Sequence, residues 1–76
     1  MEAEAMKMLA VALAIGLGSL GPALGLGLIG FAALQGIARN PEAKGPIFTN
    51  MILIAGLTEA IAIYALIVAI LLAMIV

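Results

Sequence analysis

One carboxyl group stands alone in an apolar part of this sequence. Glu59 is the single charged residue between positions 45 and 76. A carboxyl group among apolar residues favours its protonated form, because the ionised form there loses the hydration that water provides. The chemistry open to such a residue is reversible protonation. It holds a proton in apolar surroundings and releases it where water or a positive charge is supplied.

Residue types that carry other common chemistries are missing. The sequence has no Cys and no His, which excludes disulfides, zinc sites with the usual ligands and an imidazole base. Two glycine patterns match the dinucleotide-binding fingerprint, at Gly16-x-Gly18-x-x-Gly21 and Gly25-x-Gly27-x-x-Gly30. That motif binds phosphate only where a strand turns into a helix, whereas both copies lie inside one apolar stretch. We therefore expect no metal, no cofactor and no catalysis by this chain.

The composition indicates a membrane protein. Hydrophobic residues make up 67% of the 76 residues before its nine glycines are counted, and charged residues make up 9%. An ordinary soluble domain is about 45–50% apolar with its glycines included, and about 25% charged. Such a chain cannot cover its apolar surface with polar groups, which excludes a soluble monomer. The net charge of −1 also argues against nucleic acid as a partner.

The other six charges divide the chain into two spans. They lie at the amino end and in the middle, at Glu2, Glu4, Lys7, Arg39, Glu42 and Lys44. About 20 helical residues cross the roughly 30 Å hydrocarbon core, so the stretch on either side of the middle charges can cross once. We predict an amino-terminal tail at 1–7, transmembrane helices at 8–38 and 47–76, and a polar loop at 39–46. The first stretch is too long, and too acidic at its start, for a signal peptide.

The loop between the spans contains residues typical of a turn. Pro41 disfavours helix at Asn40, and Pro46 suits the first turn of a new helix. Because the loop is short, the two helices must run antiparallel as a hairpin. Arg39 and Lys44 in the loop outnumber Lys7 at the amino end, so the positive-inside rule places the loop in the cytoplasm.

Small residues of the first span fall on two opposite faces of a helix at 100° per residue. One face holds Ala14, Gly18, Gly21, Gly25, Ala32 and Gly36, and the other holds Ala12, Gly16, Ser19, Ala23, Gly27 and Gly30. Small residues mark the faces on which membrane helices approach closely. Two such faces predict a close neighbour on each side of the helix. If each copy of the chain makes the same contact with the next copy in a flat membrane, the copies close into a homo-oligomeric ring.

Glu59 lies near the middle of the predicted second helix, about 20 Å beyond the loop. An ionised carboxylate at that depth costs at least about 2.5–3.5 kcal/mol. A stripe of alanines along the same flank favours contact with an adjacent helix, at Ala55, Ala62, Ala69 and Ala73. Thr58 and Tyr64 are the nearest hydroxyls, and residues 25–27 of the first helix fall at the same depth. The alternative role for Glu59 is a permanently protonated residue that bonds two helices together.

The chain resembles, over nearly its whole length, the ring-forming c subunit of F-type ATP synthases. The resemblance rests on four features in register. Three are the segments Gly21-Pro22-Ala23-Leu24-Gly25-Leu26-Gly27, Ala38-Arg39-Asn40-Pro41-Glu42-Ala43 and Gly56-Leu57-Thr58-Glu59-Ala60, and the fourth is the position of the intramembrane carboxyl group, twenty residues after Arg39. It implies a ring with the first helix inside and the second outside, in a bacterial inner membrane or an equivalent one. It also implies that Glu59 exchanges protons with a stator a subunit, which supplies an arginine. The loop Arg39-Asn40-Pro41 would contact the central stalk, and membrane lipid would cover the rest of the ring.

The resemblance also bears on which ion is carried. Sodium-type members of the family place a glutamine on the first helix and a Ser or Thr directly after the glutamate. Leu26 and Ala60 stand at those positions here, and neither offers a side-chain oxygen. We expect protons, with sodium as the alternative. Ala23 replaces a glycine that many members have, which should loosen the closest helix approach.

Two other classes of function remain as alternatives. Small proton-coupled multidrug exporters also use an intramembrane glutamate, but they have four spans and a drug pocket lined by aromatic residues. This chain has three aromatic residues, one Tyr and two Phe. A regulatory hairpin that binds another membrane protein would need no carboxyl group at mid-depth.

Overall fold

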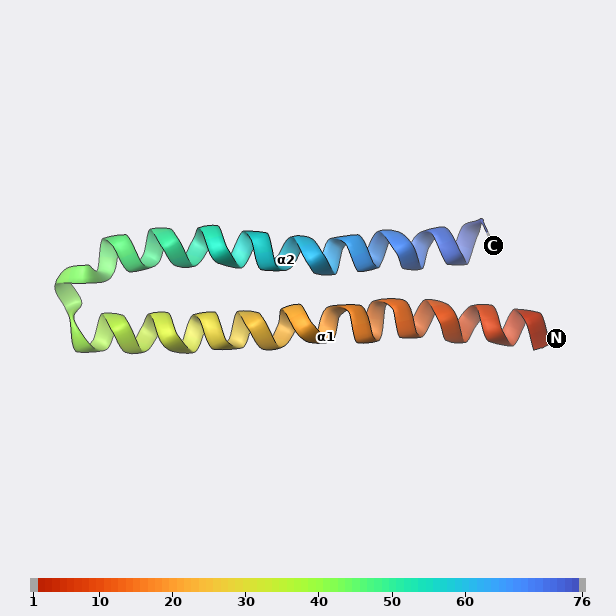
Figure 1. Ribbon diagram of the computed structural model, residues 1–76, viewed down its shortest axis with the longest axis horizontal. Coiled ribbons are helices and arrows are strands. Elements are labelled where there is room, and N and C mark those ends of the chain that lie inside the picture. Colours follow the sequence, from red (N-terminus) through yellow and green to blue (C-terminus); the bar gives the residue numbers. More distant parts are fainter. Residues whose placement is uncertain (1, 76) are drawn as a thin grey trace.

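The computed structural model describes residues 2–75, which form two long antiparallel helices joined by a tight turn (Figure 1). Helix α1 spans Glu2–Arg39, the 3-10 turn η1 spans Pro41–Ala43 and helix α2 spans Lys44–Met74. The hairpin measures 59 × 16 × 8 Å along its principal axes. The predicted all-α, two-helix antiparallel fold is confirmed.

The helix boundaries differ from those predicted at three places. Helix α1 begins at Glu2, so the described part of the predicted tail, 2–7, is helical. Its acidic residues suit a helix start, because carboxylates interact favourably with the positive end of the helix dipole. The predicted loop 39–46 is shorter, since α1 includes Arg39 and α2 begins at Lys44. Helix α2 ends at Met74; the predicted ends of the tail and of the second helix, Met1 and Val76, lie outside the described residues.

The turn is closed by backbone hydrogen bonds around Asn40. Asn40 leaves the helical conformation at φ −141° and ψ 81°, as expected for the residue before a proline. Its N–H still donates to the Gly36 carbonyl at 3.0 Å, and its carbonyl accepts from the Ala43 N–H at 2.9 Å. Pro46 falls in the first turn of α2, where a helix needs no donor from it. The turn therefore reverses the chain within four residues.

The two helices keep one register along their length. A Cβ atom built on Gly18 would lie 2.5 Å from the Ala65 Cβ, and one on Gly25 would lie 3.3 Å from the Thr58 Cγ2. A third close approach joins Gly36 to the Ile47 side chain. The steps between these contacts are equal on both helices, seven residues and then eleven. Because these three residues of α1 are glycines and have no side chain, α2 can approach α1 closely at the matching positions.

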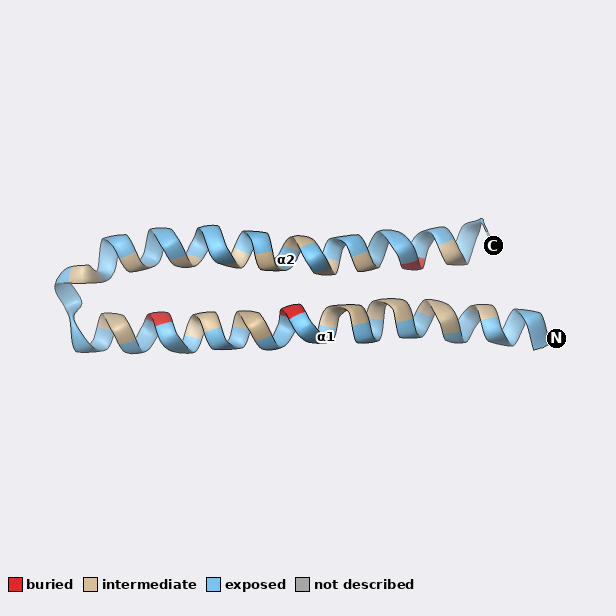
Figure 2. Cartoon of the chain, in the orientation of Figure 1, coloured by how far each residue is buried: buried red, intermediate tan, exposed pale blue. Residues whose placement is uncertain are grey.

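Most of the hairpin surface is apolar and unburied. Figure 2 shows buried and half-buried residues along the facing sides of the helices and exposed residues elsewhere. Ala33 and Ala69 are the buried hydrophobic residues of the described chain, whereas large apolar side chains around both helices are 46–78% exposed. Both helices are long and apolar enough to cross a membrane. At 1.5 Å per residue they reach about 57 and 46 Å, which exceeds the roughly 30 Å hydrocarbon core. A lipid environment is what this surface requires.

Candidate functional site

Glu59 occupies the centre of α2. It lies fifteen positions after Lys44, where the helix begins, and fifteen positions before Met74, where it ends. Each half of α2 therefore reaches about 22 Å beyond the carboxyl group, enough to hold it well inside a bilayer. Its side chain is exposed in the single hairpin, so α1 of the same chain leaves it accessible.

The residue before Glu59 makes the contact with α1. Thr58 is half-buried, and its methyl group packs against Gly25. Successive helical residues are turned by about 100°, so Glu59 points along the flank of the hairpin and away from α1. The structure therefore brings Gly25, a residue of the predicted site, close to the level of Glu59. Gly25 contacts Thr58, the residue before Glu59, and not Glu59 itself.

The two predicted hydroxyls are not directed at Glu59 within one chain. The Thr58 hydroxyl donates to the Ile54 carbonyl at 2.8 Å. Tyr64 is 67% exposed and lies five residues further on, about 140° around the helix from Glu59. The side-chain hydrogen bonds recorded within residues 2–75 are donated by Ser19, Asn50 and Thr58 to backbone carbonyls. Glu59 therefore shares no side-chain hydrogen bond in this part of the chain.

The other predicted supporting residues surround the same level. Ala60, Ala62 and Leu26 are half-buried. Ala62 belongs to the predicted alanine stripe, of which Ala55 is also half-buried and Ala69 is buried. This stripe therefore packs toward α1, the adjacent helix of the same chain. Ala73 is exposed and does not share that contact.

Of the two predicted faces of small residues on α1, one packs against α2 and the other is open within one hairpin. Gly18 and Gly25 pack against α2, as described above. Gly21 was predicted on the same face, and within one hairpin a Cβ atom added there would meet nothing within 4 Å. The opposite face is open: Gly16, Gly27 and Gly30 have no heavy atom within 4 Å of an added Cβ, and Ala23 is exposed.

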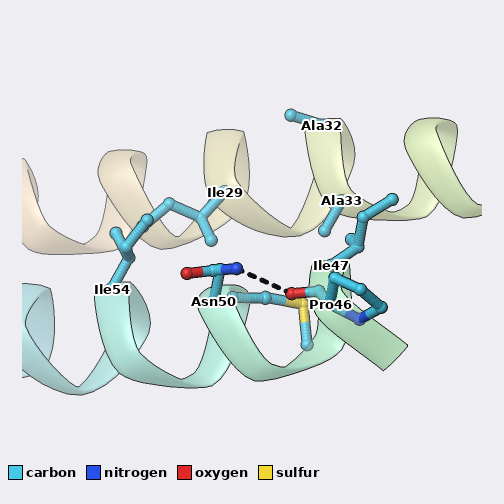
Figure 3. Close-up of a pocket in the computed structure, with 8 residues that line it drawn as sticks. Ile29, Ala32, Ala33, Pro46, Ile47, Asn50 and Ile54 are labelled. Atoms are coloured by element: carbon cyan, nitrogen blue, oxygen red, sulfur yellow. Dashed lines mark hydrogen bonds between the residues drawn. The ribbon is translucent and has the colours of Figure 1, made fainter. Parts of the chain in front are cut away.

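A groove near the turn was not predicted from the sequence. It has a volume of about 430 Å³ and lies between the loop ends of the helices, with Ile29 on α1 facing Ile54 on α2 and Ala33 facing Ile47 (Figure 3). Asn50 lines it, and its side-chain amide donates to the Pro46 carbonyl at 2.9 Å. The feature of the sequence that could have indicated this groove is Asn50, a single amide in the apolar helix α2. Glu59 does not line the groove.

The predicted contact residues of the loop gather at the tip of the hairpin. Arg39 ends α1, where its positive charge interacts favourably with the negative end of the helix dipole. Asn40 and Pro41 follow directly, and all three residues are exposed. No group of three or more His, Cys, Asp or Glu side chains within residues 2–75 could hold a metal ion.

The fold and its central carboxyl group define a class of protein: a two-helix membrane hairpin with one ionisable residue halfway along its second helix. Comparison with protein families makes this specific. The model of the ATP synthase C subunit family matches residues 9–72, and the chain belongs to this family.

Curated relatives agree over nearly the whole chain. The ATP synthase c subunit of Dehalococcoides mccartyi is 60% identical over 72 residues, which are 95% of each chain. The protein of the same name from Synechococcus sp. is 50% identical over 69 residues, 91% of this chain and 85% of that one. That from Chloroflexus aurantiacus is 44% identical over 66 residues, 87% of each chain. The relatives come from several bacterial groups, and the family membership rests on all of them.

Proposed function

We propose that this chain is the rotor-ring subunit of an F-type ATP synthase and that Glu59 is its ion-carrying residue. One observation carries the proposal: the single charge in the apolar part of α2 stands at the centre of the helix, exposed on the flank of the hairpin. Membership of the ATP synthase C subunit family supports the same function. It also speaks against a multidrug exporter or a regulatory hairpin.

The ring is supported by the unpartnered face of α1. Gly16, Gly27 and Gly30 leave open space where a second helix backbone could approach closely. A head-to-tail contact between identical hairpins closes into a ring when its rotation permits. Helix α1 of a neighbouring copy is the partner that fits this face, and this supports a ring with α1 inside and α2 outside.

The mechanism follows from the energy of a charge in lipid. Protonated, Glu59 is neutral and passes lipid as the ring turns; ionised there, it costs at least about 2.5–3.5 kcal/mol. It therefore takes up a proton from one aqueous half-channel of the stator a subunit. It releases the proton at a second half-channel, beside an arginine of that subunit. Each elementary charge that crosses 100 mV supplies about 2.3 kcal/mol, so several protons drive each ATP formed on the soluble head. The chain itself performs no catalysis.

Proton transport is favoured over sodium transport by the scarcity of oxygen ligands. Sodium binding requires several oxygens that replace the hydration shell of the ion. Leu26 and Ala60 supply none. Within one hairpin, the Glu59 carboxylate and the Thr58 hydroxyl are the side-chain oxygens at this level, fewer than a sodium ion needs.

The orientation in the membrane follows from the loop. Arg39 and Lys44 at the tip of the hairpin favour the cytoplasmic side of a bacterial inner membrane for it. There the exposed Arg39-Asn40-Pro41 segment is available to the central stalk.

A carbodiimide tests the function, because it reacts with protonated carboxyl groups in apolar surroundings. In the intact ATP synthase complex we expect it to label Glu59 and to stop proton flow. The Glu59→Gln variant should not be labelled. Absence of labelling in the wild-type complex would refute the mechanism, and slower labelling in sodium at constant pH would assign the chain to sodium.

A further inference from the structure

Thr58 is held by contacts at both branches of its side chain. Its Cγ2 lies 3.3 Å from the position that a Cβ atom of Gly25 would occupy. Its Oγ1 donates to the Ile54 carbonyl at 2.8 Å. A β-branched residue has few χ1 rotamers, and these two contacts together select one of them. Thr58 therefore fixes how α2 is rotated against α1 at this level.

This rotation also determines where the neighbouring carboxyl group points. Glu59 follows Thr58 directly, so its direction is set about 100° from the Thr58–Gly25 contact. If α2 turned at this level, the carboxyl group would move either toward α1 or further from it. We infer that Thr58, seated on Gly25, is the positioning residue that aims the Glu59 carboxyl group along the flank of the hairpin. The inference rests on the proposed function of Glu59 as the ion carrier.

The space at this contact suits one methyl group. A Cβ atom on Gly25 would sit 3.3 Å from the Thr58 methyl, so one of the two groups would have to shift by a few tenths of an ångström. Gly25→Ala adds a methyl group at the contact, and Thr58→Ser removes one. Each single change alters the packing in the opposite sense, whereas the double change conserves the volume.

The test measures the Glu59 carboxyl group directly in the intact ATP synthase complex. The rate of carbodiimide labelling of Glu59 is followed against pH by mass spectrometry of the hairpin. Gly25→Ala and Thr58→Ser should each shift the pH profile and change the rate at the wild-type midpoint about threefold or more, because contacting residues couple. The double variant should return the rate to within about twofold of wild type.

A matched control uses the second close approach of the same helices. Ala65→Gly removes one methyl group between α1 and α2 seven residues from Thr58. This variant should lower the temperature at which the ring dissociates and leave the pH profile of labelling unchanged.

Three results would overturn the inference: a wild-type profile in Thr58→Ser, no recovery in the double variant, or an equal shift in Ala65→Gly. The last would mean that helix packing in general, rather than Thr58, controls the carboxyl group. A wild-type complex that is not labelled would remove the proposed function and the inference together. A labelled wild type with unaffected variants would remove the inference alone.

Discussion

Gly18 and Ala65 form the tightest of the glycine contacts between the two helices. A Cβ atom on Gly18 would come within 2.5 Å of the Ala65 Cβ, a distance that real Cβ atoms essentially never show. Pro22 follows one turn later inside α1, and having no N–H it cannot donate to the Gly18 carbonyl as other helical residues would. Helix α1 is thus locally weakened at this contact, and the packing on Ala65 supports it there.

Gly18→Ala should therefore destabilise the hairpin by about 1–3 kcal/mol, because the added methyl group overpacks a contact made with a short, rigid side chain. Gly21→Ala adds the same methyl group where nothing lies within 4 Å, which makes it the matched control. Thermal unfolding of the detergent-solubilised protein, followed by circular dichroism, measures the difference. Equal loss of stability in the two variants would contradict the helix register described above.

Ring assembly should depend on the open face of α1. Gly27→Leu places a bulky side chain where a neighbouring copy is expected to approach, while leaving the Gly25–Thr58 contact of its own hairpin intact. We expect the mass of the detergent-solubilised complex to fall from that of a ring to that of a monomer or a small oligomer. Gly45→Leu adds the same side chain in open space beside the turn and should leave the ring mass unchanged. A full-sized ring in Gly27→Leu would show that this face does not pack.

Loss of the central carboxyl group should abolish transport and spare the structure. In Glu59→Gln the side chain keeps its shape but cannot release a proton, so ATP-driven proton pumping in membrane vesicles should fall to background. The purified ring should keep its mass. Glu42→Gln removes a carboxylate from the turn instead and should pump at close to the wild-type rate. Pumping by Glu59→Gln above background would rule out Glu59 as the carrier.

The pattern of small residues predicts which faces of α1 pack closely, but it cannot say which helix packs on each face. The face with Gly18 and Gly25 follows from helical periodicity alone, and it packs on α2 of the same chain. Periodicity says nothing of which helix fills a face, so the opposite face remains a prediction until copies are seen together. Gly21 falls on the same face as Gly18 and Gly25 by the 100° step, yet it has open space within one hairpin, so its packing partner also stays a prediction.

The turn and Asn50 show what else could not be predicted from the sequence. Charged residues suggest the ends of the helices, yet charge does not break a helix, and α2 begins at Lys44 with Pro46 in its first turn. Asn50 is easily overlooked because a single amide in an apolar run has no periodicity. Its bond to the Pro46 carbonyl becomes visible only once the helix has formed. Glu59, in contrast, stands out because no other residue within 14 positions on either side carries a charge.

The ion carried can be changed if the shortage of oxygens near Glu59 is what selects protons. The Leu26→Gln and Ala60→Ser changes together would add an amide and a hydroxyl oxygen at the two positions where this chain has none. Because replacing the hydration shell of sodium takes several oxygens at once, neither change alone should suffice. We expect sodium to slow carbodiimide labelling of Glu59 about tenfold or more in the double variant, which corresponds to about 1.4 kcal/mol of binding, and to have no effect on wild type or on either single variant. Sodium protection of the wild type would refute the assignment of protons to this chain.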